Sequence, residues 1–248
     1  MDPVSILIVF VVGFVAASFG TLVGGGSLLT IPVLIFLGLP PRLAVATNRL
    51  GSFGGTATGL YKFHEKRLID YRIGFVLGIP ALIGAVIGAS LVLQVNEILL
   101  RYVIGFMTIL ILLIVMVKPG MGLSKTKSLI KKHRYVVGGI TGFLLGMYGG
   151  FYGAGSGTFF AYVLILLFGQ TFLESAATRK VSMFFMSGMA TLVFIISGVV
   201  VYSLGIPLLV GSVTGAYVGT HYADRIGNVW IKRLFFVVVL IMGVGLLV

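Results

Sequence analysis

The sequence predicts an all-α integral membrane protein, built from two inverted-topology repeats with broken or half-length helices at the centre and about 8 to 10 membrane segments. Three observations predict this class: the composition, apolar segments along the whole chain, and an internal duplication. Of the 248 residues, 58% are hydrophobic and 10% are charged, and the mean hydropathy is +1.16. Globular proteins carry roughly 25% charged residues. This chain therefore cannot cover its apolar bulk with a surface that faces water.

Most of the apolar runs approach the length of about 20 residues that a helix needs to cross a hydrocarbon core of about 30 Å. They are residues 3–23, 73–95, 98–117, 135–152, 181–201, 204–222 and 230–248. The first run has no basic segment before it and no small-residue cleavage site after it, so we expect a retained membrane segment rather than a signal peptide. We therefore expect a multi-pass protein of the cell membrane, with the lipid bilayer as its surroundings.

Three further apolar runs, residues 28–38, 50–61 and 157–168, are too short to span a membrane alone. At a rise of 1.5 Å per residue, each would reach about 16 to 18 Å. Either they are half-helices that stop near the midplane, or they belong to full helices whose polar ends, residues 42–49 and 171–180, are shielded by protein or by a water-filled cavity.

The second half of the chain repeats the first. GTLVGGGSLLTIPVLIFLG from Gly20 aligns with GGFYGAGSGTFFAYVLILLFG from Gly149, and GIPALIGAVIGA from Gly78 aligns with GIPLLVGSVTGA from Gly205. The repeated unit is about half of the chain. The predicted organisation is a first membrane repeat, a basic cytoplasmic linker and a second membrane repeat, at residues 1–117, 118–134 and 135–248.

The distribution of Lys and Arg favours an inverted arrangement of the two repeats. If the short runs count as crossings, the repeats have opposite orientations, and every Lys and Arg lies on the inner side except Arg42, Arg49 and Arg101. If the first short run of each repeat only re-enters, the repeats are parallel and the cations divide almost evenly. Because basic loops stay in the cytoplasm, the inverted arrangement is preferred. The same rule accounts for the net charge of +12, so we expect no nucleic-acid partner.

Glycine-rich breaks occupy matching places in the two repeats, each between a long apolar run and a short one. The first consists of Gly24, Gly25, Gly26 and Ser27, and the second contains Gly153, Gly155 and Ser156. Glycine lets the chain break a helix, and the short helix that follows presents unpaired N–H groups and the positive end of its dipole. Two such ends that meet near the midplane would bind a small anion. The alternative is that these glycines only permit close helix crossings.

A second paired element follows each break, ATNR at residues 46–49 and ATRK at residues 177–180. Its hydroxyl, amide and guanidinium groups suit an oxyanion with several acceptor oxygens. The candidate side-chain contacts are Thr47, Asn48, Arg49, Thr178 and Arg179. The alternative is that the cations extend to lipid headgroups at the interface. Lys180 is expected only to help fix the orientation of the chain.

Catalysis, metals and cofactors have little support in the sequence. All six Asp and Glu residues lie in loops or at segment ends, so no buried carboxylate relay for proton or sodium coupling is visible. Passage driven by the substrate gradient and the membrane potential is therefore favoured. With no Cys, three scattered His and neither a G-x-S-x-G nor an H-E-x-x-H motif, we expect no enzyme, no metal and no cofactor.

With GGGSLLTIP followed by AVATN at residues 24–48, and GAGSGTFF followed by SAATRK at residues 153–180, the chain resembles the TauE/SafE family of membrane permeases, associated with export of sulfite and organosulfonates. The resemblance covers almost the whole chain and implies a two-fold pseudosymmetric permease for small sulfur oxyanions or related carboxylates. Arg179 stands opposite Asn48 in the alignment, so the two half-sites are not expected to bind equivalently.

The expected function is export of a small anionic substrate, of the sulfite or sulfonate type, by alternating access at a site between the two glycine breaks. The alternative is an anion channel or an anion-sensing membrane protein. The sequence specifies no oligomeric state.

Overall fold

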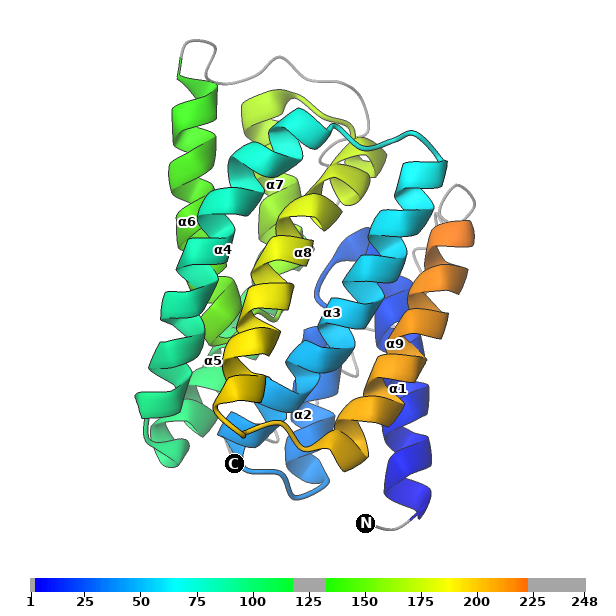
Figure 1. The fold of residues 1–248 in the computed structure, drawn as a ribbon, viewed down its shortest axis with the longest axis vertical. Coiled ribbons are helices and arrows are strands. Elements are labelled where there is room, and N and C mark those ends of the chain that lie inside the picture. The colour runs from blue at the N-terminus through cyan, green and yellow to red at the C-terminus, as the bar shows by residue number, and fades with distance from the viewer. Residues whose placement is uncertain (1–2, 118–132, 223–248) are drawn as a thin grey trace.

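The computed structural model describes residues 3–117 and 133–222, and these two stretches are helical, with no strand (Figure 1). Their helices are α1 Pro3–Val23, α2 Ser27–Phe36, α3 Pro41–Glu65, α4 Tyr71–Gln94, α5 Glu97–Val117, α6 Arg134–Phe151, α7 Ser156–Phe168, α8 Phe172–Ile196 and α9 Tyr202–His221. Within the described stretches, α1, α4, α8 and α9 are long and apolar enough to cross a membrane. The predicted all-helical membrane class is confirmed. Residues 118–132 of the predicted linker and the predicted last segment, 230–248, lie outside the described residues.

The three short apolar runs divide between the two alternatives that the sequence left open. Helix α2 has 10 residues and α7 has 13, so they would reach only about 15 and 20 Å and are half-length helices. Residues 50–61, in contrast, form no separate short helix. They continue α3, a helix of 25 residues whose polar start is buried by the surrounding protein.

Local signals explain why the polar starts of α3 and α8 are helical. Helix α3 begins with Pro41, whose fixed backbone angle suits the first turn. Helix α8 begins with a capping box, in which the Glu174 N–H donates to Thr171 Oγ1 at 3.3 Å and the Thr171 N–H donates to the Glu174 carboxylate at 2.9 Å. As a result, α8 starts at Phe172, ahead of the apolar run expected from residue 181.

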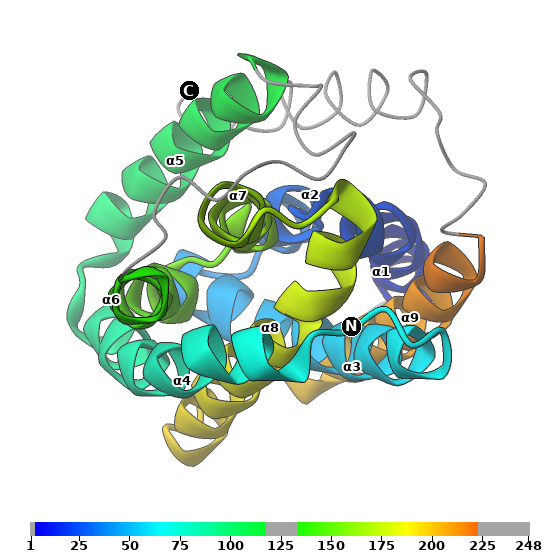
Figure 2. The same ribbon diagram turned by 90° about the horizontal axis from the view of Figure 1, so that it is seen from above.

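The two halves of the chain interlock. Helix α1 of the first half packs against α9 of the second, and α4 of the first packs against α6 and α8 of the second (Figures 1 and 2). The approach is close because Gly215 of α9 lies on the Phe14 carbonyl of α1 and Gly146 of α6 lies on the Ala81 carbonyl of α4, where a Cβ would overlap the oxygen. The small-residue faces of the helices in each half are therefore buried by helices of the other half.

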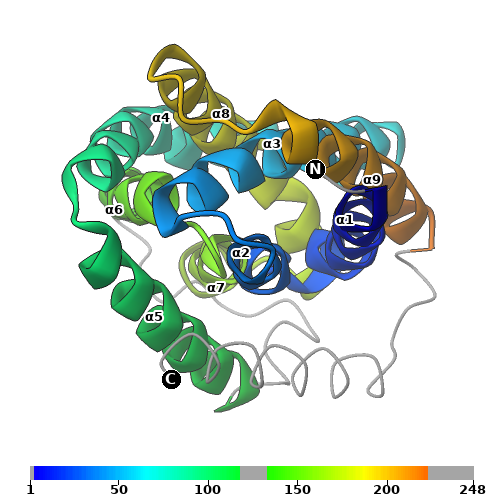
Figure 3. The same cartoon turned by 90° about the horizontal axis from the view of Figure 1, so that it is seen from below.

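The two half-length helices lie in the interior with their N-terminal ends at mid-height. In Figure 1, α2 extends into the lower part of the molecule and α7 into the upper part. Figures 2 and 3, which look along the long axis from opposite ends, show both helices between α1 and α6. The corresponding long helices α3 and α8 run in opposite directions in Figure 1, as inverted repeats would. This geometry brings the two glycine-rich breaks to the same level.

Candidate functional site

Both predicted glycine breaks are present in the fold. The chain leaves α1 and enters α2 through Gly24 and Gly25, whose φ angles are +84° and +89°. It leaves α6 and enters α7 through Gly153 and Gly155, with φ angles of +75° and +74°. These backbone angles lie in the left-handed region, which glycine adopts without the strain that a Cβ would cause. The glycines at these positions therefore allow each long helix to stop and a short one to start.

The two breaks touch each other. A Cβ placed on Gly24 would lie 2.6 Å from the backbone nitrogen of Thr158, at the start of α7. A Cβ on Gly157 would lie 3.3 Å from the Cα of Gly24, and one on Gly25 would lie 3.9 Å from the Cα of Gly155. The N-terminal ends of α2 and α7, with their positive dipole ends, are therefore adjacent.

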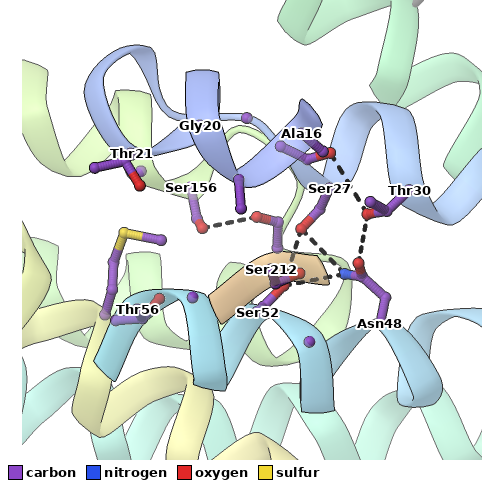
Figure 4. Close-up of a pocket in the computed structure, with 18 residues that line it drawn as sticks. Ala16, Gly20, Thr21, Ser27, Thr30, Asn48, Ser52, Thr56, Ser156 and Ser212 are labelled. Atoms are coloured by element: carbon purple, nitrogen blue, oxygen red, sulfur yellow. Dashed lines mark hydrogen bonds between the residues drawn. The ribbon is translucent and has the colours of Figure 1, made fainter. Parts of the chain in front are cut away.

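A cavity of about 520 Å³, including the space at its opening, lies beside these two helix starts (Figure 4). It is lined by small, hydroxyl and amide residues from both halves, together with one methionine. They are Ala16, Ala17, Gly20, Thr21, Gly25, Gly26, Ser27, Thr30, Asn48, Gly51, Ser52, Gly55, Thr56, Gly153, Ser156, Gly157, Met183 and Ser212. No carboxylate is among these lining residues.

Asn48 is the centre of a hydrogen-bond network on one wall of the cavity (Figure 4). Its Nδ2 donates to Ser27 Oγ at 3.0 Å, and its Oδ1 accepts from Thr30 Oγ1 at 2.5 Å. Ser52, one turn further along α3, lies 3.4 Å from Nδ2 and 3.3 Å from Ser27 Oγ. The network joins α2 to α3 and leaves hydroxyl protons that can turn toward a bound solute.

Backbone donors complete this lining. Within the described residues, the N–H groups of Gly26 and Ser27 at the start of α2, and of Gly157 at the start of α7, donate no hydrogen bond. All three residues line the cavity. Unpaired N–H groups at a helix start attract a negative charge, because the donors and the helix dipole act in the same direction.

Arg179 binds the end of the broken helix of the other half. The side chain is fully buried, and its two terminal nitrogens donate to the Gly157 carbonyl at 2.8 Å, the Thr21 carbonyl at 3.0 Å and the Leu22 carbonyl at 2.8 Å. Thr21 and Leu22 belong to the last turn of α1, where carbonyls have no partner within the helix. The guanidinium therefore caps α1 and opposes the negative end of its dipole.

Arg49 has the reciprocal role. It is 1% exposed and donates to the Gly149 carbonyl in the last turn of α6, and a Cβ on Gly153 would overlap its guanidinium. Each half therefore supplies one arginine that closes the broken long helix of the other half. Because both side chains are inside the protein, the alternative that they extend to lipid headgroups does not hold.

Positive charge near the cavity is not balanced by acidic side chains. Ion pairs in the described stretches join Lys62 to Glu65 at 2.7 Å and Arg42 to Glu97 at 3.4 Å, and neither involves Arg49 or Arg179. The terminal nitrogens of the two arginines donate to carbonyl oxygens, which carry only partial charges, and each buried Nε has no hydrogen-bond partner among the residues that the structure describes. Their positive field therefore extends into the adjacent cavity.

The family sequence model described as sulfite exporter TauE/SafE matches residues 9–246. The chain belongs to the TauE/SafE family.

Several known proteins are similar to this chain over most of their length. A probable membrane transporter protein of Haemophilus influenzae is 31% identical over 230 residues, which cover 92% of this chain and 88% of that protein. The probable membrane transporter protein YfcA of Escherichia coli K12 is 28% identical, with coverage of 100% and 91%. YdhB of Bacillus subtilis, also a probable membrane transporter protein, is 26% identical, with coverage of 98% of each chain. No solved structure shows significant similarity. This TauE/SafE protein is thus a multi-pass plasma-membrane protein of a transporter family.

The structure places six of the twelve predicted site residues of this TauE/SafE chain in the cavity wall. They are Gly25, Gly26, Ser27, Asn48, Gly153 and Ser156. Gly24 and Gly155 shape the breaks behind the wall, and Arg49 and Arg179 bind carbonyls next to it. In this conformation Thr47 and Thr178 point elsewhere.

Sequence reasoning missed the other polar residues of the α3 wall, Ser52 and Thr56, which line the cavity. They follow Asn48 at spacings of four and eight residues, so all three lie on one face of a helix. This spacing could have predicted that Ser52 and Thr56 share a face with Asn48. It was overlooked because hydropathy divides α3 at residue 50 into a polar start and a separate apolar run.

Thr47 and Thr178 hold the starts of two membrane helices. Thr47 Oγ1 accepts from the Val201 N–H, just before α9, at 3.0 Å. Thr178 Oγ1 accepts from the Asp70 N–H, just before α4, at 3.1 Å. Both side chains are fully buried. Thr47 and Thr178, which match in the two repeats, therefore have the same structural role in each half.

Replacing Thr47 by Val is expected to lower the free energy of unfolding by about 1 to 3 kcal/mol, because the partly buried Val201 N–H loses its acceptor. Thr214→Val in α9 is the control, since Thr214 is exposed and its hydroxyl bonds only to carbonyls of its own helix. Unfolding in detergent micelles measures both. Equal stabilities of Thr47→Val and Thr214→Val would contradict the assigned role.

Proposed function

We propose that this TauE/SafE protein exports a small sulfur oxyanion or organic anion, of the sulfite or sulfonate type, by alternating access. One observation supports the proposal most strongly. The cavity between the two helix breaks combines unpaired N–H groups, hydroxyls and an amide with two neighbouring buried guanidinium groups, and its lining includes no carboxylate. The description of the matched family as a sulfite exporter supports the substrate class.

An oxyanion in this cavity would accept hydrogen bonds from both halves of the chain. The N–H groups of Gly26 and Ser27 approach from α2, and that of Gly157 from α7. The Ser27 hydroxyl accepts from Asn48 and can donate its own proton to the solute. Much of the cavity volume is space at its opening, so the enclosed part suits a small oxyanion rather than a drug-sized molecule.

The proposed transport needs no coupling ion. An inside-negative membrane potential drives a monovalent anion outward by about 2.3 kcal/mol per 100 mV. A proton- or sodium-coupled carrier normally places a carboxylate on the substrate route. The lining of this cavity provides hydroxyls and amides instead. Substrate gradient and membrane potential are therefore the proposed driving forces.

The position of the site between the two halves of the chain supports alternating access. Helices α1 to α3 of the first half and α7 to α9 of the second all contribute lining residues. If each half is a repeat that moves as a unit, rocking one against the other would open the cavity to one side of the membrane and then to the other.

Counterflow tests this mechanism. Purified protein is reconstituted in vesicles loaded with unlabelled sulfite, and uptake of labelled sulfite is followed. A carrier gives saturable uptake that internal sulfite accelerates, because each return of the loaded site exchanges one anion for another. Flux without acceleration would indicate a channel, and absence of flux with sulfite, sulfonates and small carboxylates would contradict the transport proposal.

Asn48→Asp is expected to raise the apparent KM for sulfite at least tenfold. The change is nearly isosteric, but it places a carboxylate in the cavity wall where it repels the anion, and about 1.4 kcal/mol of repulsion gives that factor. Asn96→Asp adds the same charge at an exposed turn between α4 and α5 and is the control. An unchanged KM in Asn48→Asp would remove Asn48 from the binding site.

A further inference from the structure

Lys180 is a buried cation whose ammonium has no partner in the described part of the chain. The residue is 4% exposed, and its Nζ makes neither a hydrogen bond nor an ion pair there. Its neighbour Arg179 is also positive, and its terminal nitrogens donate to carbonyls of α1 and α7. Burial of an ammonium without a counter-charge is costly. From the sequence, Lys180 was expected only to help fix the orientation of the chain.

A glycine provides the space that the Lys180 side chain occupies. A Cβ on Gly59 of α3 would lie 2.9 Å from Lys180 Cε and 3.1 Å from Nζ. The end of the side chain therefore rests directly on the α3 backbone, between α3 and α8. Any larger residue at position 59 would have to displace the ammonium.

This position is one helical turn from the cavity. Thr56, three residues before Gly59 on α3, lines the cavity, and so does Met183, three residues after Lys180 on α8. Three residues correspond to about 4.5 Å along a helix. In the other direction, α3 continues to Lys62 and to the basic loop 62–72, which we place in the cytoplasm. Lys180 thus lies between the cavity and the cytoplasmic end of α3.

We propose that Lys180 forms a second anion subsite, one turn from the cavity on the cytoplasmic side, which the exported oxyanion occupies before it enters the cavity. This inference rests on the proposed function, because it assigns a step on the same route. The anion supplies the counter-charge that the ammonium lacks. A purely structural role would predict bonds between the ammonium and the protein, and none is present among the described residues.

Lys180→Gln tests the subsite, with the KM for sulfite measured separately in inside-out and right-side-out membrane vesicles. The variant is expected to raise the KM on the cytoplasmic face at least fivefold and to change the KM on the outer face less, because only the cytoplasmic approach passes Lys180. Gly59→Ala keeps the charge but fills the space under Nζ, and is expected to act in the same direction. Arg72→Gln removes an exposed cation at the same end and is the control.

Thermal unfolding separates this role from a structural one. Removal of an unpaired buried charge is expected to leave the Tm of Lys180→Gln equal to or above that of the wild type. An unchanged cytoplasmic KM, a lowered Tm with equal losses on both faces, or failure to fold would each overturn the subsite.

The two proposals fail in different ways. Absence of saturable sulfite flux in the wild type would overturn the proposed function. In that case the subsite is tested by thermal stabilisation instead. Sulfite, methanesulfonate and acetate should raise the Tm of the wild type more than that of Lys180→Gln. Equal shifts in the two proteins would overturn it.

Discussion

Replacing Arg179 by Gln is expected to abolish transport and to lower the free energy of unfolding by at least about 3 kcal/mol. The guanidinium satisfies the Gly157, Thr21 and Leu22 carbonyls at once, and a glutamine can donate to only some of them. Each buried carbonyl that loses its donor costs about 1 to 3 kcal/mol. The end of α1 would also lose the positive charge that opposes its dipole.

Unfolding in detergent micelles and sulfite flux per folded molecule measure the two effects of Arg179→Gln. Arg42→Gln is the matched control, because Arg42 is partly exposed and donates to a single carbonyl, that of Val95, besides its ion pair with Glu97. It is expected to cost about 1 kcal/mol or less. If Arg179→Gln is no less stable than Arg42→Gln, the cap on α1 does not hold the break together.

Gly24→Ala is expected to separate the two helix breaks and eliminate flux. Its φ of +84° costs an alanine about 1 to 2 kcal/mol. The new Cβ would also lie 2.6 Å from the Thr158 nitrogen, and such overpacking adds about 1 to 3 kcal/mol. The start of α7 would have to move away from α2, which takes the donors of the two half-helices out of reach of one anion.

Gly38→Ala separates the cost of backbone strain from the cost of steric overlap. Gly38 has a φ of +92°, but a Cβ there would meet nothing within 4 Å. It should therefore show the backbone cost alone, with flux retained. If Gly24→Ala transports sulfite as well as Gly38→Ala does, the contact between the two breaks is not needed for transport.

The breaks and their meeting were predictable, because glycine runs between a long and a short apolar run occur twice at matching positions. The half-length helices α2 and α7 follow from the same pattern. The continuity of α3 was not predictable from hydropathy. Its polar start is tolerated at membrane depth because Asn48 and Thr47 bond to α2 and to the start of α9, and these partners are distant in the sequence.

The roles of the arginines could not be predicted from the alignment. It places Arg49 opposite Lys180 and Asn48 opposite Arg179, so it suggests no pairing between Arg49 and Arg179. Their common role depends on carbonyls 100 and 157 residues away. Only the fold shows that the two side chains perform equivalent tasks from non-equivalent positions. The burial of Lys180 could not be predicted for the same reason, because it depends on Gly59, which is distant in the sequence and lies in the other half.

Each half of the chain caps a broken helix of the other half with an arginine, and this has a consequence for biosynthesis. Helix α1 is translated first, yet the residue that caps its end, Arg179, follows Leu22 by 157 positions. Until that residue emerges from the ribosome, the nascent first half holds unsatisfied carbonyls inside the bilayer, so it cannot reach its final form ahead of the second. Truncated chains that stop before α8 should therefore remain recognisable to quality-control proteases, and maturation completes only when both halves are present.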